Sequence, residues 1–76
     1  MALNDTTIQY LRPLNHLDYA TWARVVNWIE NEPGLHPSEI GQRLRDEDAR
    51  EIVIREAMNC LEKVYAHREY KPAAGV

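Results

Sequence analysis

The residues best suited to chemistry in this sequence are three histidines and one cysteine. His16, His36 and His67 lie far apart, and none has a second ligand at the spacing typical of a metal site. Cys60 falls on the apolar side of a helical pattern, which favours a small buried side chain over a nucleophile. The chain also lacks a glycine-rich phosphate loop. We therefore expect no catalytic residue, metal or cofactor, and a binding protein instead of an enzyme.

The composition is typical of a small protein from a reducing compartment. The 76 residues are near the lower limit for a core without cross-links, so we expect one domain over 1–76. A lone cysteine allows no internal disulfide, which favours the cytoplasm. The sequence has neither the apolar run of about 18 residues that a membrane span needs nor the pattern of a signal peptide. The net charge of −3 argues against a general nucleic-acid-binding surface, which usually carries a basic surplus.

Two helices are expected in the first half of the chain. Residues 1–16 predict an N-terminal arm or a short helix that stops before Pro13, because proline disfavours helical geometry in the residue preceding it. A longer helix is expected over 17–31, with Asn15 or Asp18 as its N-cap. Its apolar residues recur on one helical face: Trp22, Val25, Val26 and Ile29.

The second half predicts a short helix, a break and a longer helix. Pro37 suits the first turn of the short helix, with His36 as its cap and Glu39 at the capping-box position. The break covers 45–48, and the longer helix runs over 49–63 or beyond. Its apolar residues form one broad arc: Val53, Ile54, Ala57, Met58, Cys60, Leu61 and Val64.

Two features of this last region depart from a simple amphipathic helix. Ile52 falls on the polar side of the helical wheel, where an apolar residue is unexpected. Residues 64–76 form a basic, aromatic tail that either alternates as a wing-like strand or extends the helix. The core is therefore expected within 17–63, and the pattern leaves the structure of the tail open.

This arrangement resembles the winged helix-turn-helix family over about residues 20–70. The resemblance rests on the apolar face of 22–29, on Leu35 followed by the Pro-Ser-Glu-Ile start of the second helix, and on the Leu61-Glu62-Lys63 end of the third. In the family, the leucine enters a short strand and a glycine precedes the wing, whereas Val64 stands at that position here. The resemblance implies an all-α or mainly α domain of three to four helices with a short or absent wing.

The family resemblance also implies a small DNA-binding transcription regulator. Its recognition helix would begin near Asp46 and present Arg50, Arg55 and Asn59 to bases. Phosphate contacts would come from Arg43, Arg45, Lys63, Arg68 and Lys71. The charge of this region opposes that role, because residues 35–62 hold seven acidic residues against four arginines.

A protein-binding adaptor or inhibitor is the alternative, for example a phage or mobile-element protein that acts on a host nucleic-acid-binding complex. An acidic helix with an outward isoleucine suits a partner with a basic surface. The residues expected to bind that partner are Glu51, Ile52, Arg55 and Asn59. A homodimer is a further expectation, with contacts through Tyr10, Leu11 and Leu14.

Overall fold

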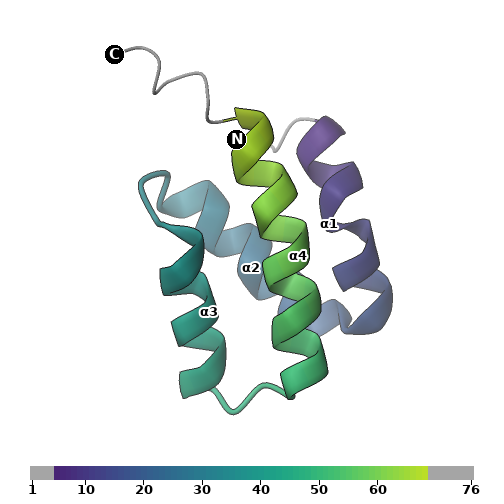
Figure 1. Cartoon of the computed structure of the whole chain (residues 1–76), viewed down its shortest axis with the longest axis vertical. Coiled ribbons are helices and arrows are strands. Elements are labelled where there is room, and N and C mark those ends of the chain that lie inside the picture. The colour runs from purple at the N-terminus through teal and green to yellow at the C-terminus, as the bar shows by residue number, and fades with distance from the viewer. Residues whose placement is uncertain (1–4, 69–76) are drawn as a thin grey trace.

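A computed structural model of the chain describes residues 5–68, which form four helices and no strand (Figure 1). The helices are α1 (Asp5–Leu17), α2 (Tyr19–Asn31), α3 (Pro37–Asp46) and α4 (Glu51–Arg68). The expectation of a mainly helical protein is confirmed for these residues. Predictions about 69–76, including the phosphate contact of Lys71, lie outside the described residues.

The four helices enclose one apolar core around α4. Helix α4 packs against α1 on one side and α3 on the other, and α2 packs against α1. Figure 1 shows α3 and α4 side by side and running in opposite directions. Every helix contributes fully buried aliphatic side chains to the core: Leu11, Leu14, Val25, Ile40, Leu44, Val53, Leu61 and Val64. The arc of α4 that the sequence predicted to be apolar is buried, except for the partly exposed Met58.

Helix α1 corrects two expectations. Pro13 lies inside this helix, so the prediction that a helix stops before it is wrong. An interior proline costs about 3 kcal/mol, but burying a leucine side chain gains about 1.5–3 kcal/mol, and Leu11 and Leu14 are both fully buried. Burial of the two leucines therefore offsets the proline. The same burial removes Leu11 and Leu14 from the expected homodimer contact, because they have no surface left for a second chain, and it leaves only the partly exposed Tyr10 of the three expected residues.

The junction between α1 and α2 is a single residue, Asp18. Its backbone is extended, and its carboxylate accepts a hydrogen bond of 3.1 Å from the backbone N–H of Thr21. Asp18 is thus the N-cap, one of the two residues that the sequence proposed for this role. The helix expected over 17–31 begins two residues later than predicted, because Leu17 completes α1.

The start of α3 matches its prediction in detail. The backbone N–H of Ser38 donates to His36 Nδ1 at 3.1 Å, and the N–H of His36 donates to Glu39 Oε1 at 2.9 Å, which completes a capping box. Leu35, which the family resemblance placed in a short strand, is buried in a turn. Its carbonyl accepts a 2.9 Å hydrogen bond from the hydroxyl of Tyr65, so α4 holds the entry to α3.

A Schellman-type turn connects α3 to α4. Ala49 N–H donates to the carbonyl of Leu44, and Asp48 N–H donates to that of Arg45, both at 3.0 Å. Asp48 adopts the left-handed conformation with a φ of 62°. Arg50 follows the turn, and its carbonyl accepts hydrogen bonds from the N–H groups of Val53 and Ile54, so α4 begins at Glu51, two residues later than the predicted Ala49.

The left-handed turn residue yields a stability prediction. Asp48→Gly should stabilise the protein by about 0.5 kcal/mol. Glycine adopts a positive φ without strain, and this gain exceeds the additional chain entropy that glycine loses on folding. Asp48→Val should instead destabilise it by about 1–2 kcal/mol, since a β-branched residue is strained there. Urea unfolding of the three proteins measures both differences. Equal midpoints for the valine and glycine variants would contradict the turn geometry.

Candidate functional site

The exposed side of α4 is the main candidate surface. We define the outer face of α4 as the exposed stripe that repeats at helical spacing along this helix: Ile52, Arg55, Asn59 and Glu62. Ile52 is 56% exposed, whereas Val53, Ile54 and Leu61 on the other side of the helix are buried. Glu51, also predicted to bind a partner, is exposed in the first turn beside Ile52. The outer face therefore brings together the residues expected for the protein-binding alternative.

Most of the residues expected to contact DNA are exposed. These are Arg45, Arg50, Arg55, Asn59 and Lys63. Among the residues that the structure describes, no carboxylate pairs with any of these arginines. Arg68 is the last residue of α4. The exposed cations thus lie on α4, on the last turn of α3 and in the turn between them.

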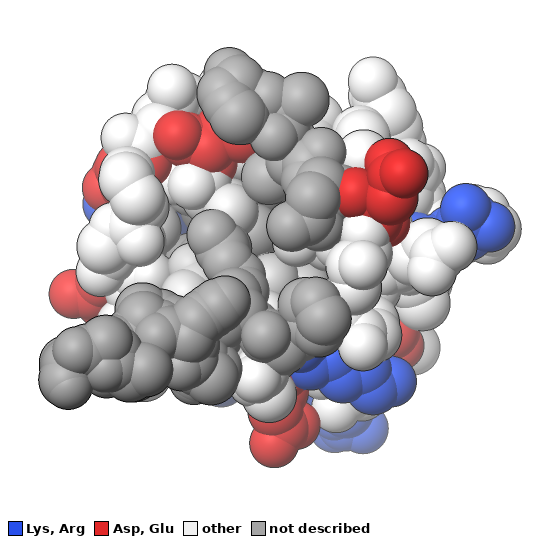
Figure 2. Space-filling view, turned by 90° about the horizontal axis from the view of Figure 1, so that it is seen from above, with Lys and Arg blue, Asp and Glu red and all other residues white. Residues whose placement is uncertain are grey.

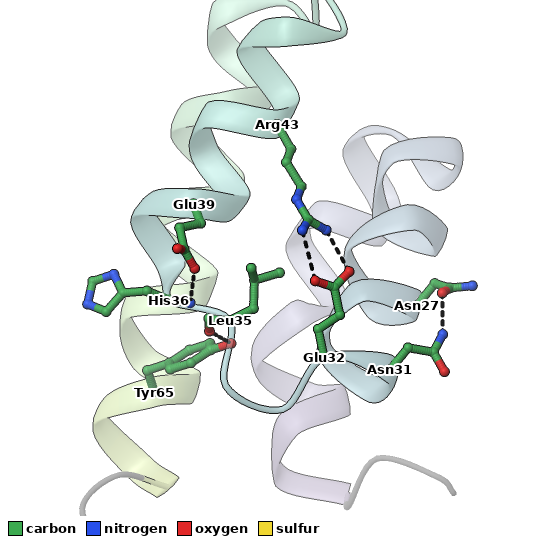
Figure 3. A network of polar contacts seen from close by, with 8 residues as sticks. All are labelled: Asn27, Asn31, Glu32, Leu35, His36, Glu39, Arg43 and Tyr65. Carbon is green, nitrogen blue, oxygen red and sulfur yellow. Dashed lines mark hydrogen bonds and ion pairs between the residues drawn. The ribbon is translucent and has the colours of Figure 1, made fainter.

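Arg43 differs from the other arginines because its guanidinium is held within the fold. Its Nη1 and Nη2 donate to the two carboxylate oxygens of Glu32 at 2.7 and 2.8 Å, as Figure 3 shows. The guanidinium carbon also lies 5.3 Å from the ring centroid of Trp28. These contacts connect the end of α2 to α3. Binding a phosphate through Arg43 would require breaking the bidentate pair.

The Glu32–Arg43 pair predicts a specific pH dependence of stability. Hydrogen bonds from Arg43 hold the pKa of the Glu32 carboxyl below its ordinary value of 4.5. As the pH falls, the unfolded chain binds this proton first, so the contribution of the pair is complete above pH 4.5 and lost as the pH falls through the lowered pKa. We expect urea midpoints of Arg43→Gln to decline less steeply below this pH than those of the wild type.

The control for this prediction is Arg45→Gln. Arg45 is exposed and has no carboxylate partner among residues 5–68, so its variant should keep the wild-type slope. The same loss of slope in both variants would mean that net charge, and not the Glu32–Arg43 pair, causes the acid sensitivity.

The surface charge of the described residues is mixed. Arg24 Nε on α2 lies 2.7 Å from Glu47 Oε1 at the end of α3, which adds a second ionic contact between these helices. On the end of the molecule seen in Figure 2, acidic and basic side chains of the described residues are interspersed.

A groove between α3 and α4 is the second candidate site, and sequence reasoning missed it. Its volume is about 490 Å³. Its apolar lining consists of Pro37, Met58 and Tyr65. Its polar lining consists of His36, Ser38, Asn59 and Glu62. Asn59 and Glu62 also belong to the outer face of α4, so the groove and that face form one continuous surface.

Gly41 affects the groove through the position of Met58. A Cβ atom on Gly41 would lie 2.9 Å from Met58 Sδ, so only glycine lets the methionine lie this close to α3. The sequence signal for the groove was therefore the buried glycine in α3, together with the tyrosine near the end of α4. Neither residue indicates a groove until the packing of α3 on α4 is known.

The surroundings of Cys60 keep its thiol unreactive. The thiol is buried and donates to Glu56 Oε2 at 3.9 Å. Burial raises its pKa, and the Glu56 carboxylate raises it further, so the thiol stays protonated.

No group of three potential metal ligands lies together within residues 5–68. None of the described helices is long and apolar enough to span a bilayer.

Comparisons with known proteins found no match, whether to family models, to curated proteins or to solved structures.

Proposed function

We propose that this protein is a small protein-binding adaptor or inhibitor that contacts its partner through the outer face of α4. The observation that carries the proposal is Ile52, which exposes 56% of its surface at the N-terminal end of a polar face. A single exposed apolar residue is ordinary. Here, however, the exposed stripe continues through Asn59 into the apolar groove beside α3, and interfaces typically combine an apolar centre with a polar rim.

Charge supports a partner with a basic surface. The protein carries 12 acidic residues against 9 basic ones. The exposed residues on α4 and around the turn that precedes it include four acids, Asp46, Asp48, Glu51 and Glu62, and four bases, Arg45, Arg50, Arg55 and Lys63, so the acidic excess belongs to the protein as a whole. Acidic groups beside an apolar contact increase the rate of encounter with a basic partner and disfavour acidic ones.

DNA binding, by a winged helix-turn-helix-like regulator, is the second candidate function. It is supported by Arg45, Arg50 and Arg55, which are exposed and have no carboxylate partner among the described residues. Arginines in this state are available for phosphates or for guanine edges.

One titration separates the two functions. The protein is titrated against labelled random-sequence duplex DNA at about 50 and about 200 mM salt, and binding is followed by anisotropy. Three phosphate contacts would weaken binding about 40-fold between these conditions. Our proposal predicts no binding at either salt concentration. Salt-dependent binding that Arg50→Gln and Arg55→Gln abolish would support the second candidate instead.

A matched pair of variants tests the protein-binding face directly. Tagged wild type, Ile52→Glu and Ile8→Glu are used to capture partners from cell extract, and captured proteins are compared by mass spectrometry. Ile8 on α1 is 41% exposed, so its variant introduces the same change outside α4. A partner retained by wild type and Ile8→Glu but lost by Ile52→Glu supports the proposal. Equal capture by all three folded proteins would overturn it.

A further inference from the structure

We propose that the groove between α3 and α4 receives an apolar side chain from a helix of the partner protein, beside a lysine or arginine that pairs with Glu62. This inference rests on the proposed protein-binding function and adds the chemistry of the partner. It follows from how the groove is built, from the charge at its rim and from its continuity with the outer face of α4.

The apolar part of the groove is held in place before any partner binds. The hydroxyl of Tyr65 donates to the carbonyl of Leu35 at 2.9 Å, which fixes the ring as one wall (Figure 3). Met58 lines the same groove, and its Sδ lies against the space that Gly41 of α3 leaves open. A preformed site loses less conformational entropy on binding, and a methionine adapts to apolar side chains of different shape.

The rim of the groove is also ordered, and it carries the exposed carboxylate of Glu62. The capping box of α3 holds His36 and Ser38, whose side chains lie 2.9 Å apart. Glu62 is exposed and forms no salt bridge with any described residue. Lys63, the next residue, points about 100° away around the helix. A cation on the partner can therefore reach the Glu62 carboxylate without displacing an existing pair.

The dimensions favour a helix over a small ligand. Ile52 and Asn59 are seven residues apart on α4, which corresponds to about 10 Å along the helix axis. A partner that contacts both Ile52 and the groove must therefore present apolar groups about two turns apart on one face. An amphipathic helix presents residues i and i+7 in this way, and helices commonly bind into grooves through such anchors.

The test uses two model peptides of about 15 residues, both with leucine at positions i, i+3, i+4 and i+7. One has lysine at the remaining positions and the other has glutamate. Each is titrated into isotope-labelled protein, and backbone amide shifts are followed by NMR. We expect the lysine peptide to shift residues around Met58, Asn59 and Glu62, and the glutamate peptide to bind at least about tenfold more weakly.

Matched variants separate the groove from general charge attraction. Glu62→Lys should weaken binding of the lysine peptide about five- to tenfold. Asp5→Lys changes the net charge equally but lies on α1, on the side of α4 away from α3, so it should weaken binding less than about twofold. Gly41→Ala, which displaces Met58, should also weaken binding although Gly41 is buried. Thermal unfolding verifies that each variant folds.

Each outcome decides the inference. Equal losses for Glu62→Lys and Asp5→Lys would mean non-specific attraction, and amide shifts confined to α1 and α2 would place the peptide elsewhere. Either result overturns the groove as the site. The proposed function is tested separately from the groove. If a partner from cell extract is lost with Ile52→Glu but kept by Glu62→Lys, protein binding through α4 stands and only the groove is rejected as the site.

Discussion

Leu61→Ala is expected to remove a large part of the stability of this protein. Leu61 has no exposed surface and lies on the buried side of α4, the helix that packs against both α1 and α3. Truncating a buried leucine costs about 2–5 kcal/mol, because the lost apolar contacts are followed by only partial collapse of the cavity. Domains have about 0.05–0.15 kcal/mol of stability per residue, which gives about 4–11 kcal/mol for 76 residues. The substitution therefore removes a third or more of the total at mid-range values.

Thermal and urea unfolding followed by circular dichroism measure this loss. For a domain of this size, each kcal/mol corresponds to about 4–8 °C, so a loss of about 3 kcal/mol lowers the Tm by about 12–24 °C. Leu17→Ala is the matched control, because Leu17 at the end of α1 is 37% exposed. It should shift the Tm by less than half as much. Similar shifts for the two variants would contradict the central position of α4.

The parts of the fold that the sequence predicted are those that local signals determine. Pro37, His36 and Glu39 form a capping box whose members lie within four residues, so their pattern indicates the start of α3 without tertiary information. The buried arc of α4 likewise follows from a period of 3.6 residues. The same periodicity predicts the outward position of Ile52, so the sequence indicates part of the candidate face.

Features that depend on tertiary contacts were not predicted. Pro13 is a local signal to end a helix, but the burial of Leu11 and Leu14 against the bundle offsets its cost, and that burial is invisible in the sequence. The same residues look available for a dimer until α1 is known to pack against α4. A local rule fails here because a non-local contact has the larger free energy.

The candidate groove likewise depends on tertiary contacts, so the sequence alone does not predict it. Met58 and Tyr65 lie seven residues apart on α4, and Gly41 lies on α3, so no sequence motif joins them. Their arrangement depends on the distance between two helices and on the Tyr65–Leu35 hydrogen bond. The Glu32–Arg43 pair is similar, since it removes one of the expected phosphate-binding arginines through a contact between distant residues.

Cys60 should be strongly protected from thiol reagents in the folded protein. Its side chain is 2% exposed, and burial raises its pKa, so both access and the thiolate form are suppressed. If labelling requires global unfolding, a stability of at least about 4 kcal/mol slows the reaction about 10³-fold relative to the unfolded chain. Labelling with Ellman's reagent in buffer and in concentrated urea measures this ratio. Leu61→Ala should label about 10²-fold faster than wild type, because a loss of about 3 kcal/mol makes unfolding that much more frequent.

The raised pKa of Cys60 also predicts how stability changes at alkaline pH. Because the folded thiol holds its proton above the ordinary value of 9.0, the unfolded chain deprotonates first as the pH rises. The contribution of the buried thiol is complete below pH 9.0 and is lost as the pH rises toward the raised pKa. Cys60→Ala should remove this part of the alkaline slope in urea unfolding. Rapid labelling of the native wild type, or an alkaline slope unchanged in Cys60→Ala, would show that the thiol is solvated and that α4 is not packed against α1 at this position.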